Sequence, residues 1–106
     1  MTKAILSVPA QRDVAAAAVF IAKDSKAAAR TFQLKMSALL TQLGDFPLTG
    51  TARLEVAGEP YRFAPIVGFP YVAIYNAMRR PPIIMRVLHG SQDLPAILQS
   101  LPENDA

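Results

Sequence analysis

Residues 26–43, KAAARTFQLKMSALLTQL, decide the fold of this chain. The large apolar residues of this stretch recur at spacings of three and four: Ala29, Phe32, Met36, Leu39 and Leu43. That spacing places them on one face of an α-helix, which must pack against another element. Asp24 and Ser25 can cap the start of this helix. Gly44 follows it, where a C-cap glycine is expected.

A second helical pattern precedes the first, from Ala10 to Lys23. Its apolar stripe consists of Val14, Ala17, Ala18 and Ile21. The connection between the two helices is only two to three residues long, which predicts an antiparallel helical hairpin. Before it, Lys3 to Val8 is interpreted as a short first strand that Pro9 ends.

Downstream of the hairpin, Asp45 to Gly58 shows no sustained period and is predicted to be a loop, with a short extended piece at Arg53 to Val56. Three stretches rich in β-branched and aromatic residues follow: Tyr61 to Ile66, Tyr71 to Ala77 and Ile83 to His89. Turn sequences separate them, so they are predicted to form a meander.

The C-terminal part is predicted to contain a short closing helix within Ser91 to Leu101 and a polar tail from Pro102 to Ala106. The order β-α-α-β-β-β, with helices and strands segregated, is typical of the α+β class. We therefore expect one domain, residues 1–106, in which the hairpin packs on one face of a small, mainly antiparallel sheet.

The amino-acid composition excludes several classes of protein and of site. A hydrophobic content of 52% excludes a disordered chain, and no apolar run approaches the roughly 20 residues of a membrane-spanning helix. The absence of cysteine excludes disulfides and a cysteine nucleophile, and one histidine does not supply a usual zinc site. We expect a cytoplasmic protein with no membrane contact and no cofactor.

Charge is unevenly placed in a chain of net charge +3. No lysine follows Lys35, and from Arg53 to Arg86 five arginines oppose only Glu55 and Glu59. Guanidinium groups pair with carboxylates or phosphates in bidentate fashion, so this half suits an anionic partner. The alternative is an ordinary solvated surface.

Several short segments, in order, resemble one family. They include Arg12-Asp13-Val14 and Phe20-Ile21-Ala22, then Leu43-Gly44-Asp45-Phe46-Pro47, Tyr61-Arg62-Phe63, and Arg86-Val87-Leu88-His89-Gly90 with Asp93-Leu94-Pro95 behind it. From Leu6 to Leu98 the chain resembles the ParE branch of the ParE/RelE toxin superfamily. The resemblance implies a toxin that a ParD-like antitoxin neutralises in a hetero-oligomeric complex, and that commonly poisons DNA gyrase.

The RelE branch of the same superfamily provides the alternative, a ribosome-dependent mRNA endonuclease. Such enzymes use clustered lysines and arginines with an acid/base residue, often a tyrosine near the C-terminus. Here the last tyrosine is Tyr75, and the basic residues that remain are Arg62 and Arg86, with His89. Period-two counting places Arg86 and His89 on opposite faces of their strand. We therefore assign no catalytic residue and expect a binding protein without direct nucleic-acid contact; a repurposed family member is the third interpretation.

Each of these three residues has a structural alternative to target binding. His89 can act as an acid/base group, or bond the backbone near the Gly90 turn. Arg62 and Arg86 can contact a target, or pair with a carboxylate such as Asp13 or Asp93.

The predicted hairpin carries more apolar surface than its core stripe needs. The residues left over are Ala15, Ala16, Val19, Ala22 and Leu34. A helix that is apolar all round is normally buried all round. Our hypothesis is that an amphipathic antitoxin helix covers this face, or the groove where the hairpin meets the sheet. The alternative for the alanines alone is their helix propensity.

Overall fold

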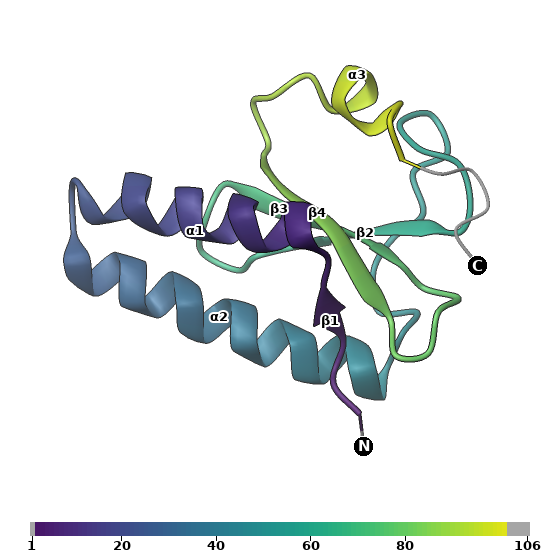
Figure 1. Ribbon diagram of the computed structural model, residues 1–106, viewed down its shortest axis with the longest axis horizontal. Coiled ribbons are helices and arrows are strands. Elements are labelled where there is room, and N and C mark those ends of the chain that lie inside the picture. Colours follow the sequence, from purple (N-terminus) through teal and green to yellow (C-terminus); the bar gives the residue numbers. More distant parts are fainter. Residues whose placement is uncertain (1, 102–106) are drawn as a thin grey trace.

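The computed structural model, which describes residues 2–101, has the element order β1-α1-α2-β2-β3-β4-α3 (Figure 1). The helices are α1 (Val8–Ala22), α2 (Lys26–Asp45) and α3 (Leu94–Leu98), and the strands are β1 (Ile5–Leu6), β2 (Tyr61–Pro65), β3 (Tyr71–Asn76) and β4 (Ile83–His89). The α1–α2 hairpin forms one layer and the sheet forms the next. The α+β class and the helical hairpin are thus confirmed.

Within the described residues the sheet has four strands in the order β1-β4-β3-β2. β2, β3 and β4 form the antiparallel meander that the sequence predicts. β1 pairs in parallel with the start of β4, with Ile5 opposite Ile83 and Leu6 opposite Ile84. Because β1 has only two residues, the outer edge of β4 is without a strand partner beyond Ile84.

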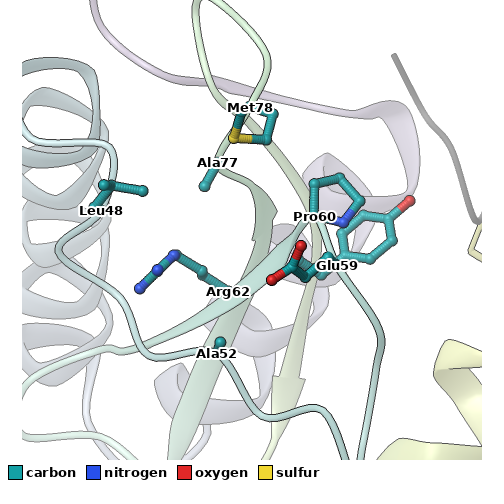
Figure 2. A pocket seen from close by; sticks show the side chains of 8 residues that line it. Leu48, Ala52, Glu59, Pro60, Arg62, Ala77 and Met78 are labelled. Carbon is teal, nitrogen blue, oxygen red and sulfur yellow. The ribbon is translucent and has the colours of Figure 1, made fainter.

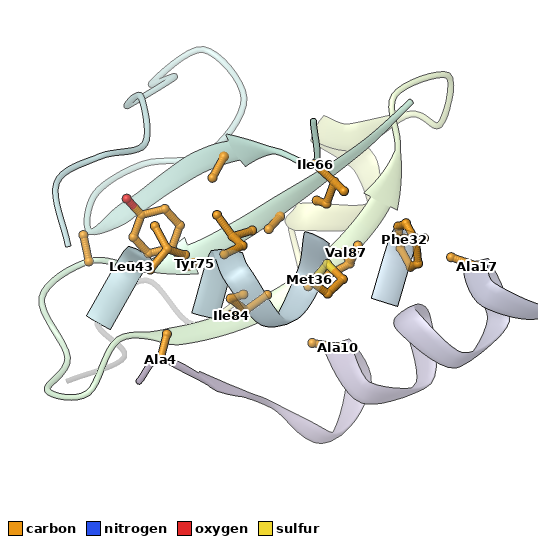
Figure 3. Packing of buried hydrophobic residues seen from close by; sticks show 14 residues of the cluster. Ala4, Ala10, Ala17, Phe32, Met36, Leu43, Ile66, Tyr75, Ile84 and Val87 are labelled. Atoms are coloured by element: carbon orange, nitrogen blue, oxygen red, sulfur yellow. The ribbon is translucent and has the colours of Figure 1, made fainter. Parts of the chain in front are cut away.

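The main core lies between the hairpin and the sheet (Figure 3). All five residues of the predicted α2 stripe are buried, and all but Ala29 belong to this core, with sheet residues that include Ala73, Tyr75, Ile84 and Val87. On the opposite face of the sheet, Ile74 and Leu88 belong to a second cluster that Leu94 and Leu98 of α3 cover. The alternation along β3 and β4 therefore serves two cores, one for each face.

The interpretation of Pro9 as the end of the first strand is wrong, because Pro9 lies in the first turn of α1. Ser7 caps this helix by accepting a hydrogen bond from the Ala10 N–H at 3.1 Å. Proline is well tolerated at this position, since the N–H groups of the first turn have no partner within the helix. The strand consequently shrinks from the predicted Lys3 to Val8 to Ile5–Leu6.

The prediction that Gly44 caps the C-terminus of this helix is also wrong, because Gly44 lies inside α2 and Phe46 is the C-cap. A Cβ atom at position 44 would clash with the Thr2 carbonyl oxygen and lie 2.8 Å from the Lys3 Cα. The N-terminal segment crosses α2 at this point, where the Ala4 N–H donates to the Leu40 carbonyl at 2.9 Å. Glycine is needed here for this close approach and not for a turn.

The remaining differences concern the loop and the chain end. Residues 53–56 form a turn in which the Val56 N–H donates to the Arg53 carbonyl, and the extended contact is instead a bridge from Thr51 to Phe63. β2 and β3 each end one residue earlier than predicted. The closing helix is confined to α3, and the predicted tail at 102–106 lies outside the described residues.

Candidate functional site

Backbone and side-chain groups from the N-terminal part of the chain form hydrogen bonds with the open edge of β4. The Ser7 N–H donates to the Ile84 carbonyl at 2.9 Å, and the Ser7 hydroxyl donates to the Met85 carbonyl at 2.8 Å. One helical turn and a half further on, the Asp13 carboxylate accepts the Val87 N–H at 3.0 Å. α1 therefore continues along β4 where β1 stops, and it supplies side-chain partners in place of a strand.

Asp13 also binds the Arg86 guanidinium in bidentate fashion. Arg86 Nε donates to Oδ2 at 2.7 Å and Nη2 donates to Oδ1 at 3.0 Å. Both side chains are partly buried, and the hydrogen bonds to Asp13 raise the pKa of Arg86. Of the two carboxylates considered from sequence, Asp13 is the partner, while Asp93 caps α3. We call these contacts of Asp13 with Arg86 and Val87 the Asp13 clamp.

His89 bonds to the turn that follows β4. Its backbone N–H donates to Gln92 Oε1 at 2.8 Å, and its Nδ1 accepts the Ser91 N–H at 3.0 Å. Its ring contacts Tyr71 edge to face, with ring centroids 5.2 Å apart. His89 pairs across the sheet with Tyr71, which packs on the hairpin side, whereas Arg86 pairs with Ile74 of the α3-side cluster. The two residues thus start from opposite faces, and Arg86 reaches α1 around the open edge.

A groove of about 340 Å³ runs between α1 and the end of β4. We call it the α1 groove; its lining includes Asp13, Ala16, Phe20, Tyr71, His89 and Gln92. The Phe20 ring is 60% exposed although it is aromatic and apolar. Sequence reasoning missed Phe20, although its spacing of four from Ala16 places both on one side of α1.

The residues predicted from the sequence to bind the antitoxin do not all lie on one surface of the structure. Ala15, Ala16 and Val19 are exposed and Ala22 is half-buried, all on α1. Of these, Ala16 lines the α1 groove. Leu34 projects from α2 and is 71% exposed, and Val19 is 64% exposed. The apolar surplus is therefore real, and it lies on the groove and on outward sides of both helices.

A second set of buried polar contacts lies at the other end of the sheet. The Tyr75 hydroxyl donates to the Pro47 carbonyl at 2.6 Å and accepts the Gly50 N–H at 2.8 Å. Arg62 Nη1 donates to the Gly50 carbonyl at 2.6 Å. Burial raises the pKa of Tyr75. We call this set the Tyr75 clamp, and it fixes the loop that follows α2. Tyr75 and its partners are 25 and 28 residues apart in sequence, so no local signal could reveal the clamp.

The clamped loop forms one wall of a pocket of about 100 Å³, which we call the sheet-end pocket (Figure 2). Its lining includes Leu48, Pro60, Arg62 and Met78, and the Arg62 side chain extends towards the loop that carries Leu48. Leu48 is 62% exposed and Met78 is 69% exposed. This end of the sheet thus presents apolar side chains on both sides of a positioned guanidinium.

Within the described residues, no two of Arg62, Arg86 and His89 contact each other: each bonds to a different segment, the loop after α2, α1 and the turn after β4. Among residues 2–101, no three His, Cys, Asp or Glu side chains lie close enough together to hold a metal ion. No helix between residues 2 and 101 is sufficiently long and apolar to span a membrane. Arg62, Arg86 and His89, the polar residues selected from the sequence, therefore do not form one site.

Comparison with known families identifies the chain. The model of the "ParE toxin of type II toxin-antitoxin system, parDE" matches residues 4–94, which is most of the sequence. A search of curated proteins found no match. The matched region contains both helices of the hairpin, the whole sheet and both clamps. The chain therefore belongs to the ParE family, whose members are toxins of type II toxin–antitoxin systems.

Proposed function

We propose that this toxin acts by binding and poisoning a protein target, with DNA gyrase as the target that the family implies. A ParD-like antitoxin neutralises it by covering the α1 groove and the outward side of the hairpin. The toxin acts in the cytoplasm. The observation that supports the antitoxin surface most strongly is the exposure of Phe20, Val19 and Leu34 on a hairpin whose core stripe is already complete.

An amphipathic antitoxin segment would remove this apolar surface from water. Burying apolar area contributes about 25 cal/mol per Å², so large side chains that are mostly exposed can supply much of the affinity. Contiguous exposed apolar surface on a small domain generally marks an interaction site. Ala15 and Ala16 then serve as small residues that let a partner backbone approach α1 closely, and Ala22 extends that surface to the end of the helix.

The open edge of β4 favours a helical partner segment over an added strand. The N–H groups of Val87 and His89, which an added strand would need, already donate to Asp13 and Gln92. A strand could pair only after both side chains were displaced, whereas a helix in the groove leaves both bonds intact.

The charge of the hairpin indicates the chemistry of that segment. Its exposed cations are Arg12, Lys23, Lys26, Arg30 and Lys35. The acidic residues of the hairpin are Asp13, which is bound to Arg86, the exposed Asp24 between the helices, and Asp45 at the end of α2. An antitoxin helix with acidic residues beside its apolar face would be complementary, which increases its association rate and specificity.

Binding is preferred to RNA cleavage because the candidate catalytic groups do not converge. A general acid/base and a phosphate-binding arginine must both reach the reacting group. Asp13 occupies the Arg86 guanidinium, while Arg62 and His89 bond to segments at different ends of the sheet.

The test of the proposed function is induction of this chain in bacteria without its antitoxin, with growth, DNA-damage response and transcript integrity assayed together. Growth arrest with a DNA-damage response and intact transcripts is the expected result. Arrest with fragmented transcripts and little DNA damage would support the ribonuclease alternative instead. Normal growth would contradict toxicity.

The hairpin surface is tested separately, with the purified toxin and its antitoxin. Val19→Lys and Leu34→Glu each place a charge where apolar burial is expected, so each should weaken antitoxin binding at least tenfold. Val67→Lys, in the β2–β3 turn, alters an equally exposed valine and is the matched control. Unchanged affinity for both hairpin variants would exclude the outward face and leave the α1 groove.

A further inference from the structure

The sheet-end pocket carries exposed apolar side chains that the antitoxin surface does not explain. Leu48 and Met78 are as exposed as Val19, Phe20 and Leu34 of the hairpin. The Tyr75 clamp fixes the loop that carries Leu48: a Cβ atom at Gly50 would lie 2.7 Å from the Tyr75 ring, so the loop fits closely against the sheet. Met78 is in the turn after β3, where its N–H donates to Asn76 Oδ1 at 2.9 Å. A loop whose backbone is already fixed favours binding, because less backbone entropy remains to be lost.

The lining of this pocket contains one cation, Arg62, and one anion, Glu59. Arg62 is positioned by the Gly50 carbonyl, and among residues 2–101 no carboxylate forms an ion pair with it. Glu59 lies across the same pocket without bonding to Arg62. The exposed Arg80 follows Met78 in the adjoining turn, where its Nη1 donates to the Ala77 and Arg79 carbonyls. A guanidinium fixed by one carbonyl retains donors for a carboxylate.

The size of the pocket limits what can enter it. A cavity of roughly 150 Å³ holds benzene, so about 100 Å³ admits one small side chain and not a length of chain. Leu48 and Met78 line the pocket and are mostly exposed, so they could contact apolar neighbours of that side chain. Phosphate contacts of nucleic acids instead use polar and cationic rims. The pocket therefore suits a protein surface.

We infer that the sheet-end pocket is the surface with which this toxin contacts its protein target, and that it takes a carboxylate side chain flanked by apolar residues. This inference rests on the proposed function, since it assigns the target-binding step to a site. The pocket and the α1 groove are at opposite ends of β3, because Tyr71 lines the groove and Ala77 lines the pocket. Six residues of extended strand separate them by roughly 20 Å, so each surface can be altered alone.

The test compares growth arrest by four forms of the full chain induced without antitoxin: the wild type, Leu48→Glu, Met78→Glu and Leu54→Glu. Leu54 is in the same loop region and is equally exposed, but it does not line the pocket. Antitoxin affinity and the unfolding temperature are measured for each purified variant. We expect Leu48→Glu and Met78→Glu to reduce toxicity at least a hundredfold while antitoxin affinity and unfolding temperature stay unchanged. Leu54→Glu should remain toxic.

Wild-type toxicity in both pocket variants would overturn the inference and leave the proposed function intact. A harmless wild type would contradict the proposed function, and the inference with it. If either Leu48→Glu or Met78→Glu unfolds, the toxicity of the other, folded variant tests the inference. Joint loss of toxicity and antitoxin binding in a folded variant would contradict separate surfaces.

Discussion

The Asp13 clamp and the Tyr75 clamp perform the same task with different chemistry. Each fixes a segment to the sheet beside an exposed apolar surface: α1 beside its groove, and the loop after α2 beside the sheet-end pocket. The Asp13 clamp is an ion pair near solvent, with side chains that are 15% and 26% exposed. The Tyr75 clamp centres on a neutral phenol with no solvent exposure.

The comparison shows how a small domain can display apolar side chains without collapsing onto them. Phe20 and Leu48 cannot stabilise the elements that carry them, because both remain mostly in water. The polar clamps hold those elements instead, and a preorganised surface binds with a smaller entropic cost. Changes to each clamp should therefore affect the stability of its own segment and the surface beside it.

The largest effect is expected from Asp13→Ala. This change leaves the Arg86 guanidinium and the Val87 N–H without their shared acceptor in a partly buried site. The free energy of unfolding should fall by about 2–4 kcal/mol, as measured by urea denaturation. Glu55→Ala is the control, because Glu55 pairs with Arg53 at 3.5 Å on the exposed surface. That pair should contribute less than about 1 kcal/mol, and an equal loss in both variants would contradict the special role of the Asp13 clamp.

Tyr75→Phe should have the next largest effect. It removes the partner of the Gly50 N–H and the Pro47 carbonyl while keeping the buried ring. We expect a loss of about 1–3 kcal/mol, accompanied by faster hydrogen exchange at Gly50 and Thr49. Exchange at Val87, in the Asp13 clamp, should stay unchanged. Faster exchange in both clamps would show that they are coupled.

Alkaline pH should distinguish the clamps further. Burial raises the folded-state pKa of Tyr75 above its ordinary value of 10.0. A raised pKa means that the folded chain retains the proton more strongly than the unfolded chain, so this stabilisation is complete below pH 10.0 and is lost as pH rises above it. The free energy of unfolding should therefore fall more for the wild type than for Tyr75→Phe between about pH 9.5 and about pH 11, a range that brackets the ordinary pKa of tyrosine. Parallel curves would contradict the assigned cause.

The sequence predicts the parts of this structure that depend on periodicity. The stripe from Ala29 to Leu43 predicts the buried face of α2, and the three β-rich stretches predict β2, β3 and β4. It does not predict the parallel pairing of β1, because two residues carry no pairing signal. Gly44 was misread for a related reason: only the tertiary approach of Thr2 explains it.

The candidate site divides in the same way. Spacing along α1 exposes the apolar surplus that includes Val19, since helix geometry alone determines it. Pairing of Arg86 with Asp13 could be considered from sequence but not chosen over Asp93, because the residues are 73 apart in the chain. Tyr75 and Phe20 were missed, since a buried hydroxyl clamp and a groove exist only once distant elements meet.

The smallest effect on stability is expected from Gln92→Ala, which tests whether Gln92 protects the open edge of β4. Gln92 is exposed and accepts the His89 N–H, which can bond to water instead. The stability should change by less than about 1 kcal/mol. The freed edge should nevertheless increase self-association, measured by sedimentation, because an open N–H row recruits further strands. An unchanged sedimentation profile would show that Asp13 alone protects the edge.

The central claim is that one toxin uses separate surfaces for its antitoxin and its target. The most direct test is growth of bacteria that produce both toxin and antitoxin, with the toxin carrying Phe20→Glu in the α1 groove. We predict that the antitoxin rescues cells with the wild-type toxin but not cells with Phe20→Glu, which stays toxic because the sheet-end pocket is intact. Full rescue of the Phe20→Glu cells, when that variant alone arrests growth, would contradict the claim.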